Sequence, residues 1–160
     1  MTTLCSTPET TYLKHIQFVL SNIKTEKDES NLAKIAFIIA AAISSKFNQF
    51  VDQEQIVQLL MQKTQNKRPV SYLDIKQVFN SLGFSVDAIK SDNKDILNEL
   101  SQYIFITQDS HNNYIANIAS SDSKLYFIYG KFGQDAIICS LNRSLFLRNF
   151  TNNKFLILND

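Results

Sequence analysis

The sequence predicts an α+β protein, in which helices from the first half pack on a twisted, mostly antiparallel sheet from the second half. Up to Gly83 the apolar residues recur about every 3.6 residues, which is the spacing of helices. Beyond Gly83 the spacing changes to about 2, in short segments rich in β-branched and aromatic residues. Because the helices precede the strands, the order does not fit a βαβ protein.

Four helices are expected before Gly83. Thr7 can cap a first helix that begins at Pro8 and runs to about Lys24. Ser30 or Asn31 can cap the next helix, LAKIAFIIAAAISSKF, whose few polar positions predict nearly complete burial. The other two helices are DQEQIVQLLMQK, capped by Asp52, and SYLDIKQVFNSLGF, with Gly83 where a C-terminal cap belongs.

The second half contains short segments bounded by Asp, Asn, Ser or Gly, which indicate strands. They are FSVDAIK, YIFIT, NYIANI, KLYFIYG and AIICS, followed by a short helix around residues 144–148 and a last strand, KFLIL. With 160 residues, 44% of them hydrophobic, the chain can bury one sizeable core. A single globular unit is therefore expected.

Charge and composition exclude several classes of partner. The net charge of +1 provides little attraction to nucleic acid, so no nucleic-acid partner is expected. Cys5 and Cys139 lie far apart, and no Cys/His cluster offers the ligands that zinc requires, so neither a metal nor another cofactor is expected. The sequence lacks GxxxxGK(S/T), so nucleotide hydrolysis would need another domain or chain.

No secretory signal or membrane span is expected. The N-terminus lacks a basic start followed by a continuous apolar run, which predicts a cytoplasmic location with reduced thiols. The most apolar stretch, residues 32–43, is shorter than the roughly 20 residues that span a bilayer.

The order of these segments resembles the double-glycine, or bacteriocin-leader, cysteine peptidase domain that precedes peptide- and toxin-exporting ABC transporters. In that family the nucleophilic Cys opens a buried helix, two helices follow, and strands carry the other catalytic residues. The segments that carry the resemblance are 30–33, 51–60, 70–84, 103–107, 113–118, 125–130, 145–150 and 155–158. The resemblance implies a papain-like fold, with residues 1–24 as an N-terminal helical extension and residues 25–160 as the peptidase-like domain.

The resemblance also implies that the catalytic residues are replaced. The nucleophilic Cys falls on Ser30, the general-base His on Asn113, and the Asp that orients this His on or beside Gly130. The Gln that helps to form the oxyanion hole falls near Lys24. A papain-like site needs a thiolate beside an oriented imidazole, so a degenerate, inactive site is expected, with Ser30 as a helix cap.

Two alternatives would retain activity. A shifted register in DSHNNY would move His111 onto the site, although it lies two positions, or roughly 6.6 Å, from Asn113 and this polar run is typical of a surface turn. A pair of Cys5 and His111 would supply a thiolate, but the following helices would then be out of order by one element. Cys139 is expected to be a buried strand residue.

Strand aromatics offer contacts for a partner. Tyr114, Tyr126 and Tyr129 are the candidates for exposed, substrate-binding contacts, because tyrosine combines apolar area with a hydroxyl group. Noncatalytic relatives in the family are attached to type I secretion transporters, where they hold the unfolded exported polypeptide near the channel. The resemblance therefore implies a cytoplasmic recognition domain at the inner face of the bacterial plasma membrane.

The implied partners are an unfolded exported polypeptide and the transmembrane and nucleotide-binding domains of an ABC exporter. Two other functions stay open. One is an active double-glycine leader peptidase with a divergent site. The other is a free-standing protein-binding adaptor.

Overall fold

The computed structural model describes residues 10–25, 30–91, 99–100, 102–121, 123–132, 135–149 and 154–160. The helices are α1 (Thr10–Ser21), α2 (Asn31–Phe47), α3 (Gln53–Thr64), α4 (Tyr72–Ser81) and α6 (Arg143–Asn149). The strands are β1 (Ile23–Lys24), β2 (Val51–Asp52), β3 (Val86–Lys90), β4 (Phe105–Gln108), β5 (Tyr114–Ser120), β6 (Lys124–Phe132), β7 (Asp135–Asn142) and β8 (Lys154–Leu158). This order confirms the α+β class that the sequence predicts.

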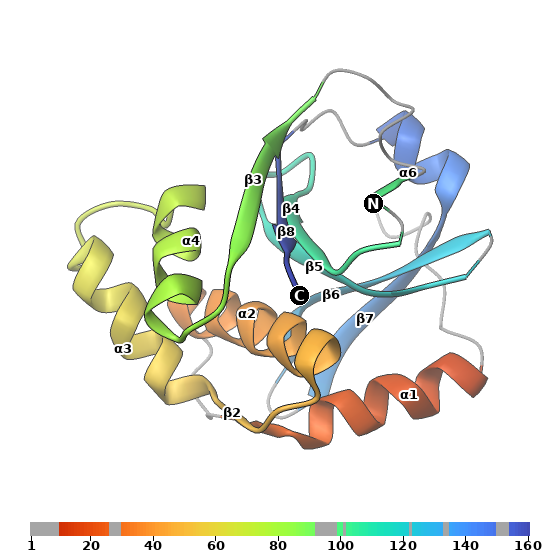
Figure 1. Cartoon of the computed structure of the whole chain (residues 1–160). Coiled ribbons are helices and arrows are strands. Elements are labelled where there is room, and N and C mark those ends of the chain that lie inside the picture. The colour runs from red at the N-terminus through yellow and green to blue at the C-terminus, as the bar shows by residue number, and fades with distance from the viewer. Residues whose placement is uncertain are drawn as a thin grey trace.

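The strands from β3 to β8 form one six-stranded sheet in the order β3-β8-β4-β5-β6-β7. Every neighbouring pair in it is antiparallel, as expected. β1 and β2 form a separate parallel pair. Figure 1 shows α2, α3 and α4 on one side of the sheet, while α6 packs on the other side. Among the helices of the described residues, none combines the length and the apolar character needed to cross a membrane.

Apolar side chains cover both faces of the sheet. Tyr114 and Ala116 of β5 face the helices and belong to the larger core, which they share with α2. The residue between them, Ile115, points to a second, smaller core on the opposite face. Phe127 stacks there on Phe146 of α6, with ring centroids 5.2 Å apart. The double burial explains why the strands are nearly continuous apolar runs.

α2 forms the centre of the fold, as its composition predicts (Figure 1). Residues 35–44 are all buried, because the helix contacts α1 and α3 as well as β5 and β6. At its C-terminal end, Asn48 adopts a left-handed conformation with φ 51°, which suits asparagine at a helix end. α2 therefore presents its N-terminal end, with Ser30 and Asn31, at the margin of the core.

The structure corrects one helix boundary. The first helix was expected to continue to about Lys24, but α1 ends at Ser21 and the chain becomes extended in β1. The reason is tertiary pairing: the Val51 N–H donates to the Asn22 carbonyl at 2.8 Å, and β1 then pairs with β2. The expected start of this helix at Pro8, with Thr7 as its cap, lies outside the described residues.

Candidate functional site

A cleft of about 520 Å³ opens where the first turns of α2 meet the α3–α4 loop and the sheet. α2 contributes residues three or four positions apart, which share one helix face. The lining residues are Asn31, Lys34, Ile35 and Ile38 of α2, Pro69 and Val70 of the loop, and Gln108, Asn112, Asn113, Tyr114 and Tyr129 of the sheet and its β4–β5 turn. The cleft thus combines segments that are far apart in the sequence.

Ser30 is the N-cap of α2, which is the role expected from its position. Its backbone is extended, with φ −60° and ψ 162°, and its Oγ accepts a hydrogen bond from the Ala33 N–H at 3.2 Å. The side chain is exposed, and the cleft lining begins at the next residue, Asn31. Ser30 therefore stands at the helix start beside the cleft, with its oxygen engaged in capping.

Asn113 lines the cleft where the β4–β5 turn returns to β5. Its N–H donates to Asp109 Oδ1 at 2.9 Å, and its carbonyl accepts from the Asp109 N–H at 2.9 Å. The same Oδ1 accepts from the His111 N–H at 2.9 Å. The expectation that Asp109 lies on the surface is wrong, because these turn hydrogen bonds allow the residue to be buried, at 8% exposure.

His111 lies exposed on this turn and is not among the residues that line the cleft. Its Nδ1 is 3.3 Å from the Ser110 Oγ. The register shift that would bring His111 to the site does not occur, since Gln108 of β4 pairs regularly with Tyr114 of β5. Cys5, the other member of the alternative pair, lies outside the described residues. Cys139 is buried in β7, as expected, but it is disulfide-bonded, which corrects the expectation of reduced thiols for this residue.

Gly130 lies on β6, the neighbour of β5, directly against the first turns of α2. It adopts φ +144°, a conformation that residues with side chains rarely take. A Cβ at this position would be 3.9 Å from Cγ and 4.0 Å from Cβ of Lys34. The aliphatic part of Lys34 thus passes over Gly130. Lys24, in contrast, is exposed on β1 and does not line the cleft.

The three candidate tyrosines have different environments. The expectation that Tyr114 is exposed is wrong, because its side chain is buried in the larger core and its hydroxyl donates to the Val70 carbonyl at 2.7 Å. Burial raises the pKa of Tyr114 above its usual value, with smaller contributions from Tyr72 and Asp74. Burial also raises the pKa of Tyr129 to about 12, and the negative charge of Asp109 acts in the same direction. Both phenols stay protonated at neutral pH and can donate hydrogen bonds.

The structure corrects the predicted exposure of Tyr126. It was expected to be an exposed contact, but its side chain is completely buried in the core between the helices and the sheet. The residue types in β6 do not distinguish its two faces, because both faces of the sheet are covered. Tyr126 therefore contributes to packing and not to the surface of the cleft.

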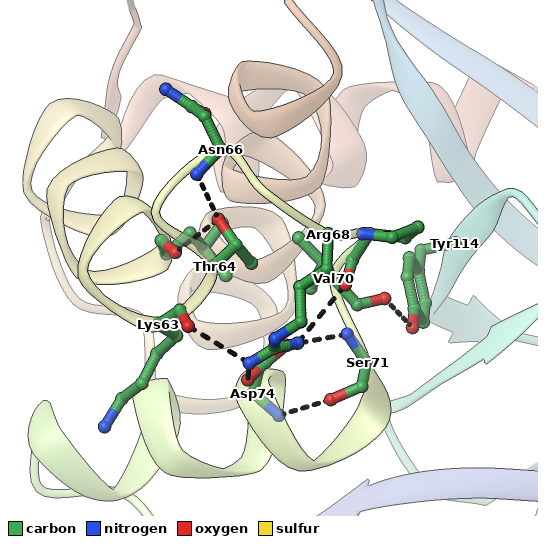
Figure 2. A network of polar contacts seen from close by, with 10 residues as sticks. Lys63, Thr64, Asn66, Arg68, Val70, Ser71, Asp74 and Tyr114 are labelled. Carbon is green, nitrogen blue, oxygen red and sulfur yellow. Dashed lines mark hydrogen bonds and ion pairs between the residues drawn. The ribbon is translucent and has the colours of Figure 1, made fainter.

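An ion pair that sequence reasoning missed fixes the loop wall of the cleft (Figure 2). Arg68 donates from both terminal nitrogens to Asp74, at 2.6 and 2.8 Å, and also to the Lys63 carbonyl at 3.0 Å. Asp74 accepts from the Ser71 N–H at 2.9 Å, while Ser71 Oγ accepts from the Asp74 N–H at 3.2 Å. The spacing Ser-x-x-Asp is the signal of this capping box in the sequence.

The network determines the charge state of Asp74. The hydrogen bonds from Arg68 lower the pKa of Asp74 to about 2, against an opposing effect of burial, and hydrogen bonds from Ser71 add to the decrease. A bidentate Arg–carboxylate pair is geometrically specific as well as charged. Because the pair closes the loop from Lys63 to Asp74, it holds Pro69 and Val70 in position at the edge of the cleft.

Comparisons with family models and with curated proteins find no match to this chain. Solved structures are similar to it. One is a double glycine motif protease from an AMS/PCAT transporter in complex with the leader peptide, with a TM-score of 0.59 and 13% identity over 85% of this chain and 91% of that chain. Another is the peptidase domain of Streptococcus ComA, a bi-functional ABC transporter involved in a quorum sensing pathway, with a TM-score of 0.55 and 15% identity over 85% of this chain and 96% of that chain. The chain therefore has the fold of the double-glycine peptidase domains, as the order of its sequence segments predicts.

Proposed function

We propose that this chain is a catalytically inactive peptidase-like domain of a type I secretion, toxin-exporting ABC transporter, and that it binds the unfolded secretion substrate. The observation that carries the proposal is the open cleft beside the start of α2. The sequence resemblance assigns Ser30, Asn113 and Gly130 to the catalytic positions, and none of these is a cysteine, histidine or aspartate. The cleft is thus available to a polypeptide, but its chemistry differs from that of a cysteine peptidase.

The side chains around the cleft favour inactivity. Peptide hydrolysis by a cysteine or serine nucleophile needs a base that accepts its proton. Asn113 has a carboxamide, which does not accept a proton at neutral pH. Among the described residues that line the cleft, none has a thiol or an imidazole. The Ser30 hydroxyl would therefore stay protonated and weakly nucleophilic.

The same side chains favour binding. The carboxamides of Asn31, Gln108, Asn112 and Asn113 offer donors and acceptors that match the backbone of an extended polypeptide. Ile35 supports apolar contacts, and the half-buried Tyr129 provides aromatic surface. Tyr114 lines the cleft but is buried, and Tyr126 does not line it. An unfolded partner loses conformational entropy on binding, so we expect a Kd that is micromolar or weaker.

The fold relatives support a peptide partner and a transporter context. One of them is a protease from a transporter in complex with a leader peptide, and the other is the peptidase domain of an ABC transporter. We accordingly assign the transmembrane and nucleotide-binding domains of an exporter as further partners, and the cytoplasmic face of the membrane as the location. Residues 1–24 would extend the domain formed by residues 25–160, with Ile16 of α1 anchored in the shared core.

A titration followed by NMR tests the proposal. The labelled protein is mixed with one candidate export substrate in its unfolded and in its folded form. We expect the unfolded form to shift the amide signals of Asn31, Asn113 and Tyr129. Its overall affinity should depend only mildly on the salt concentration, because the net charge is +1. Preference for the folded form, or shifts confined to a distant surface, would favour the free-standing adaptor and contradict the proposal.

A further inference from the structure

Among the described residues that line the cleft, Lys34 is the one with a charged side chain. The others are carboxamides, tyrosines, aliphatic residues and a proline. The described lining residues around this cation are therefore neutral, and the negative charge of Asp109 acts on one of them, Tyr129. Its position one turn into α2 places it beside Asn31 on the same helix face.

The charge of Lys34 is not neutralised by the described part of the protein. The described ion pairs are Lys46–Asp160 and Arg68–Asp74, and neither involves Lys34. Asp109, in the adjoining turn, has its Oδ1 engaged with the backbone N–H groups of His111 and Asn113. The Lys34 side chain is exposed, so its ammonium group is accessible to a ligand.

Two further features lie beside the Lys34 side chain: the start of α2 and the strand at Gly130. The first turn of the 17-residue helix α2, from Asn31, contains no acidic residue, and the start of a helix carries a partial positive charge. Gly130 leaves the aliphatic part of Lys34 lying directly over the strand, with contacts of 3.9 and 4.0 Å to the position of an added Cβ. These are ordinary van der Waals distances, so the Lys34 side chain lies against the strand at Gly130.

We infer that the cleft selects polypeptide segments that carry a carboxylate, and that this carboxylate pairs with the Lys34 ammonium. This inference rests on the proposed function and specifies its ligand. The carboxamide nitrogens of Asn31 and Asn113 are on the same lining and provide further donors for an anion. The carboxylate belongs either to an Asp or Glu side chain or to the C-terminus of the bound chain.

Three peptides of equal length distinguish a side-chain carboxylate from a C-terminal carboxylate. The first has internal glutamates and an amidated C-terminus, the second has glutamines in their place and is also amidated, and the third has the glutamines and a free C-terminal carboxylate. Their Kd values are measured from the shifts of the Asn31, Asn113 and Tyr129 amides. Each peptide is titrated against the unmodified chain, the Lys34→Gln variant and the control variant Lys76→Gln, which removes the same charge. Lys76 lies on α4 and is not among the residues that line the cleft.

We expect at least one carboxylate peptide to bind about three- to tenfold more tightly than the neutral peptide, a range typical of one partly exposed ion pair. This preference should disappear in Lys34→Gln, persist in Lys76→Gln and weaken with added salt. Preference for the first peptide identifies a side-chain carboxylate, and preference for the third identifies the C-terminus.

Equal affinities for all three peptides, or a preference that persists in Lys34→Gln, would overturn this inference and leave the proposed function standing. If no peptide shifts the cleft amides, both are overturned. The dispersion of the amide spectrum verifies that each variant is folded, and Gln is a suitable replacement because its helix propensity is close to that of Lys.

Discussion

The Tyr114 hydroxyl donates a hydrogen bond to the Val70 carbonyl at 2.7 Å and so connects β5 to the loop between α3 and α4. The Tyr114 ring also meets the edge of Tyr72 at the start of α4, with centroids 5.4 Å apart. Tyr114 and Val70, the two residues joined by the hydrogen bond, both line the cleft. The width of the cleft therefore depends on a hydrogen bond between its sheet wall and its loop wall.

Replacing Tyr114 by Phe should destabilise the protein. The substitution keeps the ring but leaves the buried Val70 carbonyl without its donor, so we expect a loss of about 1–3 kcal/mol in the free energy of unfolding. Urea unfolding measures this loss. Tyr103→Phe is the control, because Tyr103 is exposed, and it should change stability by less than about 0.5 kcal/mol. Equal effects of the two variants would contradict the role given to the hydrogen bond.

The Arg68–Asp74 pair should make stability depend on acid pH. The folded pKa of Asp74 is about 2, below the value of about 3.9 in an unfolded chain, so the pair stabilises the fold fully above about pH 4. This contribution, about 2 kcal/mol, is lost as the pH falls from about 4 to about 2. Unfolding free energies measured across this range should show the loss in the unmodified protein.

Asp74→Asn should remove that pH-dependent step and lower stability at neutral pH, because Arg68 loses its charged partner. Asp87→Asn is the matched control, since Asp87 is exposed on β3 and has no ion pair among the described residues. A step of unchanged size in Asp74→Asn would show that other groups cause it.

Ser30→Ala should cost about 1 kcal/mol, because the Ala33 N–H loses its capping acceptor. Ser30→Asp should retain stability, since Asp is an equally good cap and its charge is favourable at a helix start. Thermal unfolding of both variants measures the difference. If Ser30→Ala is as stable as the unmodified protein, the serine is not needed as a cap.

The protein should not cleave a Gly-Gly leader peptide, because the positions assigned to nucleophile, base and orienting residue hold Ser30, Asn113 and Gly130. Mass spectrometry of the incubated peptide tests for products. The controls are Ser30→Ala and Cys5→Ala. Cleavage that either substitution abolishes would establish an active peptidase with a divergent site.

The sequence predicts the elements of this fold well, because their signals are local. The capping serine and the Ala/Ile-rich composition of α2 are sufficient to predict its start and its burial. The end of α1 was missed because β1 depends on pairing with β2, which is distant in the sequence. The burial of Tyr126 was also missed, since the apolar pattern of a sheet covered on both sides does not show which residues reach the surface.

The cleft was less predictable than the fold. Its walls come from residues 31–38, 69–70, 108–114 and Tyr129, which meet only through tertiary packing. The Arg68–Asp74 pair spans six positions, a separation that matches neither helical nor strand spacing, although the Ser-x-x-Asp capping box was visible in the sequence. The assignment of Ser30, Asn113 and Gly130 to catalytic positions stays a prediction.

The contact between Lys34 and Gly130 limits which residues position 130 can hold. A side chain there would be strained at φ +144°. Its Cβ would also lie 3.9 Å from Cγ of Lys34, so an acidic residue at position 130 would bring a carboxylate close to the Lys34 side chain. The residue types at positions 34 and 130 therefore constrain each other.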